Sequence, residues 1–112
     1  MMETFTEYQI AAERTINPML TPGENTAHSL LGMASEVGEL LGLYQKVYQG
    51  HWLDLNHVVK ELGDLLWMMA EFCTANEISL SYVAWKNIQK LKERYPDGFD
   101  AEKSLHRAAG DV

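Results

Sequence analysis

Residues 30–45 read LLGMASEVGELLGLYQ, and residues 58–73 read VVKELGDLLWMMAEFC. Almost every position in both stretches is apolar or small, and charged side chains are few. A helix that is apolar almost all round has to be covered on several sides. Neither stretch alternates apolar and polar residues as a half-buried strand would. The two stretches therefore predict an all-α fold built around two buried helices.

The flanking residues supply start and stop signals for these helices and for their neighbours. Thr21-Pro22-Gly23-Glu24 has the order of a capping box with proline in the first turn, and Gly50 is a plausible helix stop. Asp54 and Ser79 are suitable caps for later helices. We expect a helical bundle of four main helices plus a short C-terminal helix. Their expected ranges are about 4–16, 21–49, 54–75, 80–94 and 100–107.

Length and composition indicate one globular domain, residues 1–112. The single cysteine, Cys73, excludes an intrachain disulfide and a cysteine-based zinc cluster, and we expect it in the core. No stretch reaches the roughly 18 apolar residues of a membrane span, and Met1 opens no signal-peptide pattern. We therefore expect a cytoplasmic protein that does not bind membranes.

The charge distribution opposes nucleic-acid binding and favours a metal with a small anion. The net charge is −7, whereas duplex binding depends on Lys and Arg that neutralise phosphates. The exception is the helix expected over 80–94, where Lys86, Lys90 and Arg94 recur every four residues with Asn87 beside them. This basic face could bind a polyphosphate, or it could be an ordinary solvated surface.

Two acidic motifs interrupt the apolar helices: Glu36-Val37-Gly38-Glu39 and Glu61-Leu62-Gly63-Asp64. Residues three apart share a helix face, so antiparallel packing would bring four carboxylates together. Buried like charges need protons or cations to compensate them. Carboxylates without cysteine or a Glu-x-x-His motif favour Mg²⁺ or Mn²⁺ over zinc or di-iron chemistry. The alternative is a solvated acidic stripe at the edge of the bundle.

Further side chains could line such a site. Lys46 lies two turns beyond Glu39 and is a candidate phosphate ligand, and His28 and His57 lie near the acidic faces. Trp67 lies one turn beyond Asp64 and could contact a base. The two apolar helices also exceed what four or five short helices can cover, so we expect self-association at least to a dimer.

The chain resembles the MazG-like all-α nucleoside triphosphate pyrophosphohydrolases over about residues 8–107. The family signature is E-x-x-E followed by E-x-x-D, as at Glu36 and Glu39 and at Glu61 and Asp64. The segments SEVGELLGLYQK, KELGDLLWMMAEF and NIQKLKERYPDGF extend the similarity. The order and spacing of these segments together carry the resemblance.

The resemblance implies a Mg²⁺-dependent enzyme that cleaves a nucleoside triphosphate between its α and β phosphates, releasing the monophosphate and pyrophosphate. It implies assembly as a dimer or a dimer of dimers. The metal would be held, and catalysis carried, by the four acids of the two motifs. Phosphate would be contacted by Asn87, Lys90 and Arg94. Independently of the resemblance, we expect Trp52, Trp67, Met68 and His28 as candidates for the substrate pocket.

Two positions depart from the family pattern, and two alternative functions stay open. Relatives with the Leu-Trp-Tyr version of the third helix have tyrosine where this chain has Met68, and many have glutamate at Lys60. The phosphoribosyl-ATP pyrophosphohydrolases belong to the same fold group. A non-catalytic helical interaction module would use the acids as a docking face instead.

Overall fold

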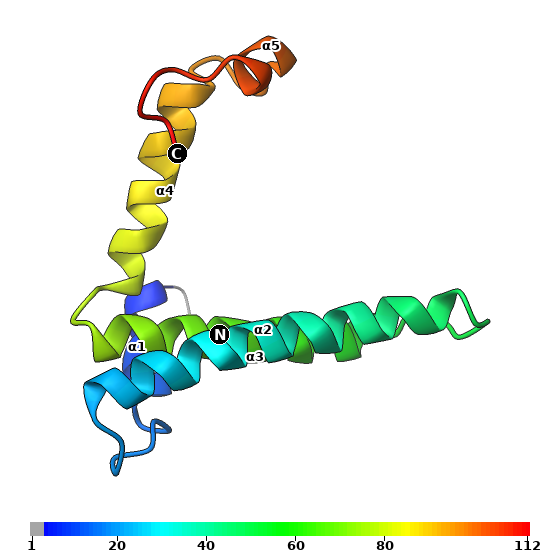
Figure 1. Ribbon diagram of the computed structural model, residues 1–112, viewed down its shortest axis with the longest axis vertical. Coiled ribbons are helices and arrows are strands. Elements are labelled where there is room, and N and C mark those ends of the chain that lie inside the picture. The colour runs from blue at the N-terminus through cyan, green and yellow to red at the C-terminus, as the bar shows by residue number, and fades with distance from the viewer. Residues whose placement is uncertain (1–3) are drawn as a thin grey trace. The chain divides into compact units, whose positions relative to one another are not determined.

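The computed structural model describes residues 4–112 as helices joined by short connections, without a named strand (Figure 1). The all-α prediction is confirmed for this part of the chain. The five helices are α1 (Phe5–Glu13), α2 (Pro22–Val47), α3 (Leu55–Ala75), α4 (Leu80–Arg94) and α5 (Ala101–Leu105).

Two of the predicted caps, Thr21 and Asp54, are present at the starts of α2 and α3, and the Ser79 cap stays a prediction. The Thr21 hydroxyl accepts the Glu24 N–H, and the Glu24 carboxylate accepts the Thr21 N–H, which completes the capping box of α2. The Asp54 carboxylate accepts two backbone N–H groups at the start of α3. Gly50 has a φ of 96°, the left-handed conformation that the α2–α3 connection requires.

The first helix ends at Glu13, three residues earlier than expected. The Thr15 hydroxyl donates to the Ala12 carbonyl at 2.7 Å, and the chain leaves the helix in a turn before Pro18. A threonine hydroxyl that binds a nearby carbonyl competes with continued helix formation. The expected boundary at Pro18 was therefore too late.

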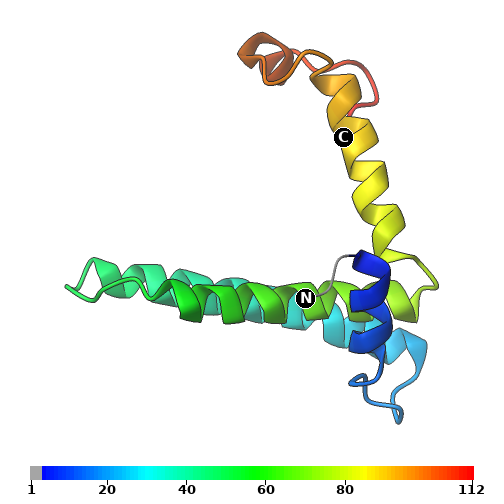
Figure 2. The ribbon, with the colours of Figure 1, turned by 180° about the vertical axis from the view of Figure 1, so that it is seen from behind.

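Helices α2 and α3 form a long antiparallel hairpin (Figures 1 and 2). The Asn76 side chain donates to the Thr26 hydroxyl at 3.0 Å, and His28 contacts Glu71. Further along, Met68 lies against Gly32. Residue numbers thus increase along α2 as those of their partners decrease along α3, and this register places the two acidic motifs opposite each other.

Helix α1 packs across α3 and is tied to the end of the hairpin by polar contacts. The Gln9 amide donates to the Ile78 carbonyl at 3.0 Å and accepts the Leu80 N–H at 2.7 Å. A small core forms beneath, and Cys73 lies in it as expected. The members of this core are Ala12, Ala70, Cys73 and Leu80.

The chain divides into two compact units, the first reaching Leu80 and the second covering Ser81–Val112. In the second unit, α4 leads into a turn at Pro96–Gly98, and the Tyr95 and Phe99 rings pack with centroids 5.6 Å apart. The chain's end returns to α4, where Asp111 pairs with Arg94. The expected single domain, residues 1–112, stays a prediction. None of the described helices is both long enough and apolar enough to cross a bilayer.

Candidate metal centre

Three of the four predicted carboxylates meet between the facing helices of the hairpin. One oxygen from each of Glu36, Glu61 and Asp64 lies within 4.8 Å of the other two. Glu36 comes from α2, and the other two come from α3. Hard divalent cations take carboxylate oxygens from several side chains in this way. The three carboxylates therefore form a candidate metal centre.

Glu39 lies outside this group of three. It follows Glu36 by three residues on α2, which turns its side chain about 60° around the helix axis. Its side chain is exposed, although its negative charge still acts on Glu36. The prediction that Glu39 is a metal ligand stays open.

Glu36 is the carboxylate that most needs a positive partner. Its Oε2 is buried and has no hydrogen-bond partner among the described residues. The neighbouring Glu61 carboxyl, with which it would share a proton, raises the pKa of Glu36 most. Desolvation and the negative charges of Asp64, Glu61 and Glu39 raise this pKa further. An orphaned buried oxygen among like charges fits a bound cation.

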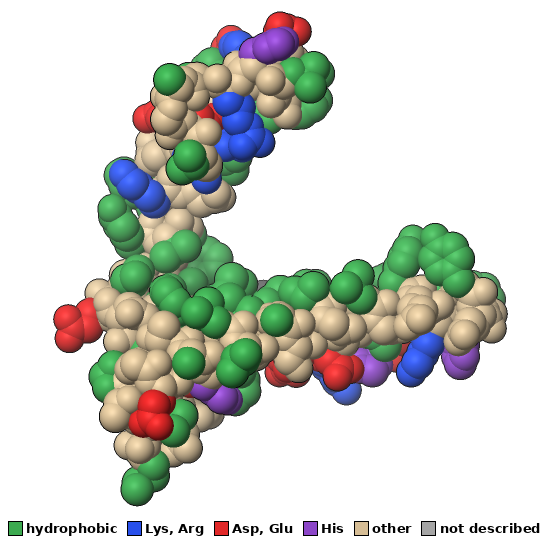
Figure 3. Space-filling view, viewed as in Figure 1, with side chains coloured by type: hydrophobic (Ala, Val, Ile, Leu, Met, Phe, Trp, Pro, Cys, Tyr) green, Lys and Arg blue, Asp and Glu red, His purple; other side chains and the backbone are tan. Residues whose placement is uncertain are grey.

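The polar residues of the hairpin gather along one edge. His57 Nε2 lies 3.0 Å from Glu61 Oε1, one turn before the acidic motif. Figure 3 shows acidic, basic and histidine side chains together on this edge, the lower one in that view. Lys46 is exposed near the end of α2, and its predicted phosphate contact is untested. The candidate metal centre thus lies on the polar edge of the hairpin.

The glycines inside the two acidic motifs leave space beside the carboxylates. A Cβ added at Gly38 or at Gly63 would meet no heavy atom within 4 Å. Gly32 is different, because a Cβ there would lie 2.1 Å from Met68 Sδ. Close approach of the two helices therefore depends on Gly32, whereas the motif glycines open the surface around the acids.

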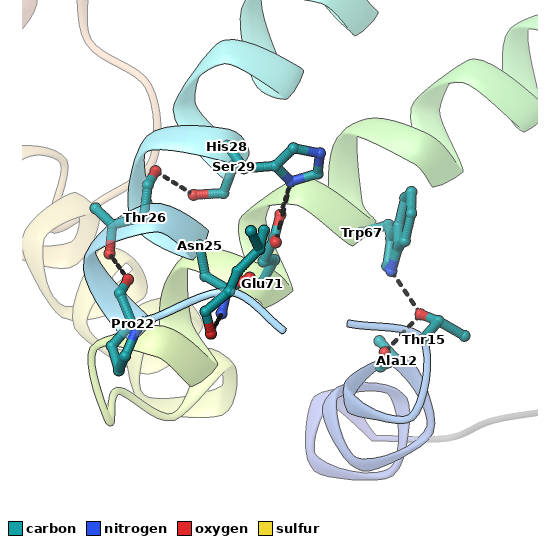
Figure 4. Close-up of polar contacts among 10 residues, drawn as sticks. Ala12, Thr15, Pro22, Asn25, Thr26, His28, Ser29, Trp67 and Glu71 are labelled. Carbon is teal, nitrogen blue, oxygen red and sulfur yellow. Dashed lines mark hydrogen bonds and ion pairs between the residues drawn. The ribbon is translucent and has the colours of Figure 1, made fainter. Parts of the chain in front are cut away.

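The four predicted pocket residues lie in different surroundings. Met68 is only 4% exposed and fills the contact between α2 and α3. The Trp67 ring is half-buried and donates its N–H to the Thr15 hydroxyl at 2.8 Å (Figure 4). Trp52 is 97% exposed in the connection after α2. His28 is held by Glu71 on the polar edge. Substrate contact by any of them stays a prediction.

The predicted phosphate ligands Asn87, Lys90 and Arg94 lie on α4, in the second unit. Arg94 donates two hydrogen bonds to the Asp111 carboxylate, at 2.8 and 2.7 Å. Lys90 donates to the backbone oxygen of Val112. The Arg94 guanidinium lowers the pKa of Asp111 by hydrogen bonding and by its charge. Asp111 and Val112 thus bind Arg94 and Lys90, two of the three residues expected to contact phosphate.

The sequence motifs point to neither Glu71 nor Asp111 as a functional partner. Glu71 follows Asp64 by seven residues in an apolar stretch, so it returns to nearly the same face of α3. That spacing was a usable signal. Asp111 carried no comparable signal, because only the fold of the second unit brings it to Arg94.

A family model for the MazG nucleotide pyrophosphohydrolase domain matches residues 25–99 of the chain. The chain belongs to this family. The matched range contains both acidic motifs of the hairpin and the basic face of α4. The MazG family assignment confirms the resemblance found in the sequence.

The chain is also similar to a curated relative, the Gene 37 protein of Mycobacterium phage L5. The two are 28% identical over 107 residues, which cover 81% of this chain and 88% of the phage protein. No solved structure gives a significant match. The family of this chain is therefore assigned from the MazG domain match.

Proposed function

We propose that this chain is a Mg²⁺-dependent nucleoside triphosphate pyrophosphohydrolase, active in nucleotide-pool cleansing or homeostasis. It would cleave a ribo- or deoxyribonucleoside triphosphate between the α and β phosphates. The observation that carries the proposal is the convergence of Glu36, Glu61 and Asp64 in a chain of the MazG family. Mn²⁺ is a second candidate metal, because the same hard oxygen ligands suit it.

The acidic residues of the hairpin would bind the metal, and one of them would accept or donate a proton. Glu36, Glu61 and Asp64 are the ligands expected for Mg²⁺, with Glu39 at the margin of the site. When bound, the metal supplies Lewis-acid stabilisation of phosphate charge and lowers the pKa of coordinated water. Because its pKa is raised, the Glu36 carboxylate would accept a proton more readily than an ordinary glutamate.

The basic face of α4 would hold the phosphates of the substrate. Lys90 and Arg94 carry the positive charge that a departing pyrophosphate requires, and Asn87 adds a neutral donor. Arg94 already binds a carboxylate through two parallel hydrogen bonds, the geometry in which guanidinium groups also bind phosphate. Asp111 would have to leave Arg94 before phosphate could take its place.

Self-association is part of the proposal and is supported by the other edge of the hairpin. Several large apolar side chains there are exposed in the single chain, and Figure 3 shows them in green along the upper edge. They lie about half a turn around each helix from the polar residues. Exposed apolar surface of this extent is typical of an interface. Members of this apolar edge are Val37, Leu41, Tyr44, Leu55, Val59 and Leu62.

The decisive experiment measures pyrophosphate release from canonical and modified ribo- and deoxyribonucleoside triphosphates in the presence of Mg²⁺. We expect nucleoside monophosphate and pyrophosphate as the products, separated by ³¹P NMR from diphosphate and phosphate. Glu61→Gln and Asp64→Asn should abolish release while keeping the helical circular dichroism signal. Glu102→Gln, in the exposed part of α5, is the matched control and should keep wild-type activity.

Two outcomes would contradict the proposal. Near-normal turnover in Glu61→Gln or Asp64→Asn would reject the candidate metal centre. A wild-type chain that binds no Mg²⁺ and releases pyrophosphate from no triphosphate would favour a non-catalytic interaction module. Phosphoribosyl-ATP belongs in the same substrate screen, since selective cleavage of it would assign the chain to the related pyrophosphohydrolases of that substrate.

A further inference from the structure

A histidine–carboxylate pair lies on the polar edge of the hairpin, apart from the candidate metal centre. His28 Nδ1 lies 2.7 Å from Glu71 Oε1 and 3.0 Å from Oε2 (Figure 4). Glu71 is only 4% exposed, whereas the His28 side chain is 54% exposed. A buried carboxylate thus fixes the ring of a histidine whose other face meets solvent.

From this pair we infer that His28, positioned by Glu71, recognises the nucleoside part of the substrate. The inference rests on the proposed function and deepens it. His28 would contact substrate directly, and Glu71 would be the positioning residue. The metal centre and the basic face of α4 provide for the phosphates, whereas this pair provides a directional hydrogen-bonding group for the nucleoside.

The contact with Glu71 determines which hydrogen bond His28 can offer. An ionised carboxylate only accepts hydrogen bonds, so Nδ1 must carry the ring hydrogen. In the neutral ring Nε2 is then an acceptor. The neutral ring of His28 would therefore select a hydrogen-bond donor on the nucleoside. Three kinds of group supply one: a sugar hydroxyl, an amino group of the base, and the ring N–H of uracil, thymine or guanine.

The helical spacing places His28 and Glu71 on the same edge as the candidate metal centre. Glu71 follows Asp64 by seven residues on α3, a rise of about 10.5 Å with a rotation of only about 20°. His28 precedes Glu36 by eight residues on α2, a rise of about 12 Å. Because α2 and α3 are antiparallel, both steps run in the same direction along the hairpin.

Gly32 and Met68 lie between the metal centre and the pair along α2 and α3. Gly32 has no side chain, and the buried Met68 packs directly against it. Neither residue places a long polar side chain between the two sites. A nucleotide lying along the hairpin, with its phosphates at the carboxylates, would therefore bring its nucleoside to His28.

The test compares the wild type with His28→Ala and His28→Gln over a set of triphosphates. Loss of one hydrogen bond should raise KM about tenfold in His28→Ala with little change in kcat. Gln can supply an acceptor oxygen and should restore most of the loss. The matched control is His106→Ala, at the end of α5, which should leave the kinetics unchanged.

Two further arms identify the recognised group and the role of Glu71. A 3′-deoxy substrate should lose the His28 effect if the sugar hydroxyl is the donor. Exchanging cytidine for uridine should remove the effect if the base amino group is the donor, and should strengthen it if a ring N–H is the donor. Glu71→Leu should produce the same KM rise as His28→Ala, and the double variant should add nothing. Circular dichroism and urea unfolding would show that each variant is folded.

Binding measurements separate nucleoside recognition from a general structural effect. His28→Ala should weaken binding of a nucleoside monophosphate about tenfold and leave binding of inorganic pyrophosphate unchanged. Equal weakening of both, or unchanged kinetics in an active His28→Ala variant, would overturn the inference and leave the proposed function intact. A wild type without activity on any triphosphate would overturn both.

Discussion

Replacing Gly32 by alanine should destabilise the hairpin, although alanine is the better helix former. The new Cβ would lie 2.1 Å from Met68 Sδ and 2.7 Å from its Cγ. Carbon contacts are optimal at roughly 3.5–4.0 Å, so Met68 would have to move by well over 1 Å. Met68 is 4% exposed and has little room to do so.

The expected magnitude follows from two opposing effects. Overpacking a filled core costs about 1–3 kcal/mol, and replacing a mid-helix glycine by alanine recovers about 1 kcal/mol. We expect Gly32→Ala to lower the free energy of unfolding by up to about 2 kcal/mol, with a central value of about 1 kcal/mol. Met68→Ala alone should cost about 2–5 kcal/mol, since it leaves a cavity.

The double variant reveals whether the contact itself is responsible. With Met68 replaced by alanine, the Cβ at position 32 has space, and Gly32→Ala should then stabilise by about 1 kcal/mol. The coupling in the double-mutant cycle should therefore equal the overpacking cost, about 1–3 kcal/mol. Gly42→Ala is the control, because its Cβ would meet nothing within 4 Å. It should stabilise by about 1 kcal/mol in either background.

Urea unfolding followed by far-UV circular dichroism measures the free energies of unfolding of the wild type, the two single variants, the double variant and the Gly42→Ala controls. The reasoning would be refuted if Gly32→Ala changed stability equally in the presence and absence of the Met68 side chain. It would also fail if Gly32→Ala stabilised the wild type as much as the Gly42→Ala control. Either result would mean that α2 and α3 do not approach at Gly32.

Three other predictions follow from charge and exposure. Because the pKa of Glu36 is raised, the stability of the fold should fall as pH rises from about 4.5 through that pKa. Thermal melts should show this loss of stability, and added Mg²⁺ should reverse it. The Glu36→Gln variant should not show it. Because the pKa of Asp111 is lowered, its ion pair with Arg94 should stabilise the second unit at pH values above the ordinary aspartate pKa. This stabilisation should be lost as pH falls through the lowered pKa. An NMR titration of the Asp111 carboxyl checks this, and a midpoint at or above the ordinary value would contradict it. Light scattering should give the mass of a dimer or tetramer for the wild type and a smaller mass for Leu41→Glu; a monomeric wild type would exclude self-association through the apolar edge.

The helix starts were predictable because their signals are local. Thr21, Asp54 and Asp100 each cap the helix that follows within three residues of chain, so no distant contact is needed. The end of α1 was less predictable. It depended on a competition between helix continuation and the Thr15 hydroxyl, which residue preferences alone do not resolve.

The meeting of carboxylates was partly predictable. Residues three apart share a helix face, so each motif was expected to present two acids, and antiparallel packing was expected to join them. The structure brings together Glu36, Glu61 and Asp64 and leaves Glu39 at the margin. The rotation of α2 against α3 decides this difference, and the Gly32–Met68 contact is part of what sets it.

The sequence by itself determined the all-α class, the helix starts and the family, because these depend on periodicity, caps and motif order. Only the tertiary structure decided that Glu71 holds His28 and that Asp111 holds Arg94. These partners are 43 and 17 residues apart, and no helical repeat relates them. Pairing at such separations depends on the register and turns of the folded chain, which local sequence patterns do not specify.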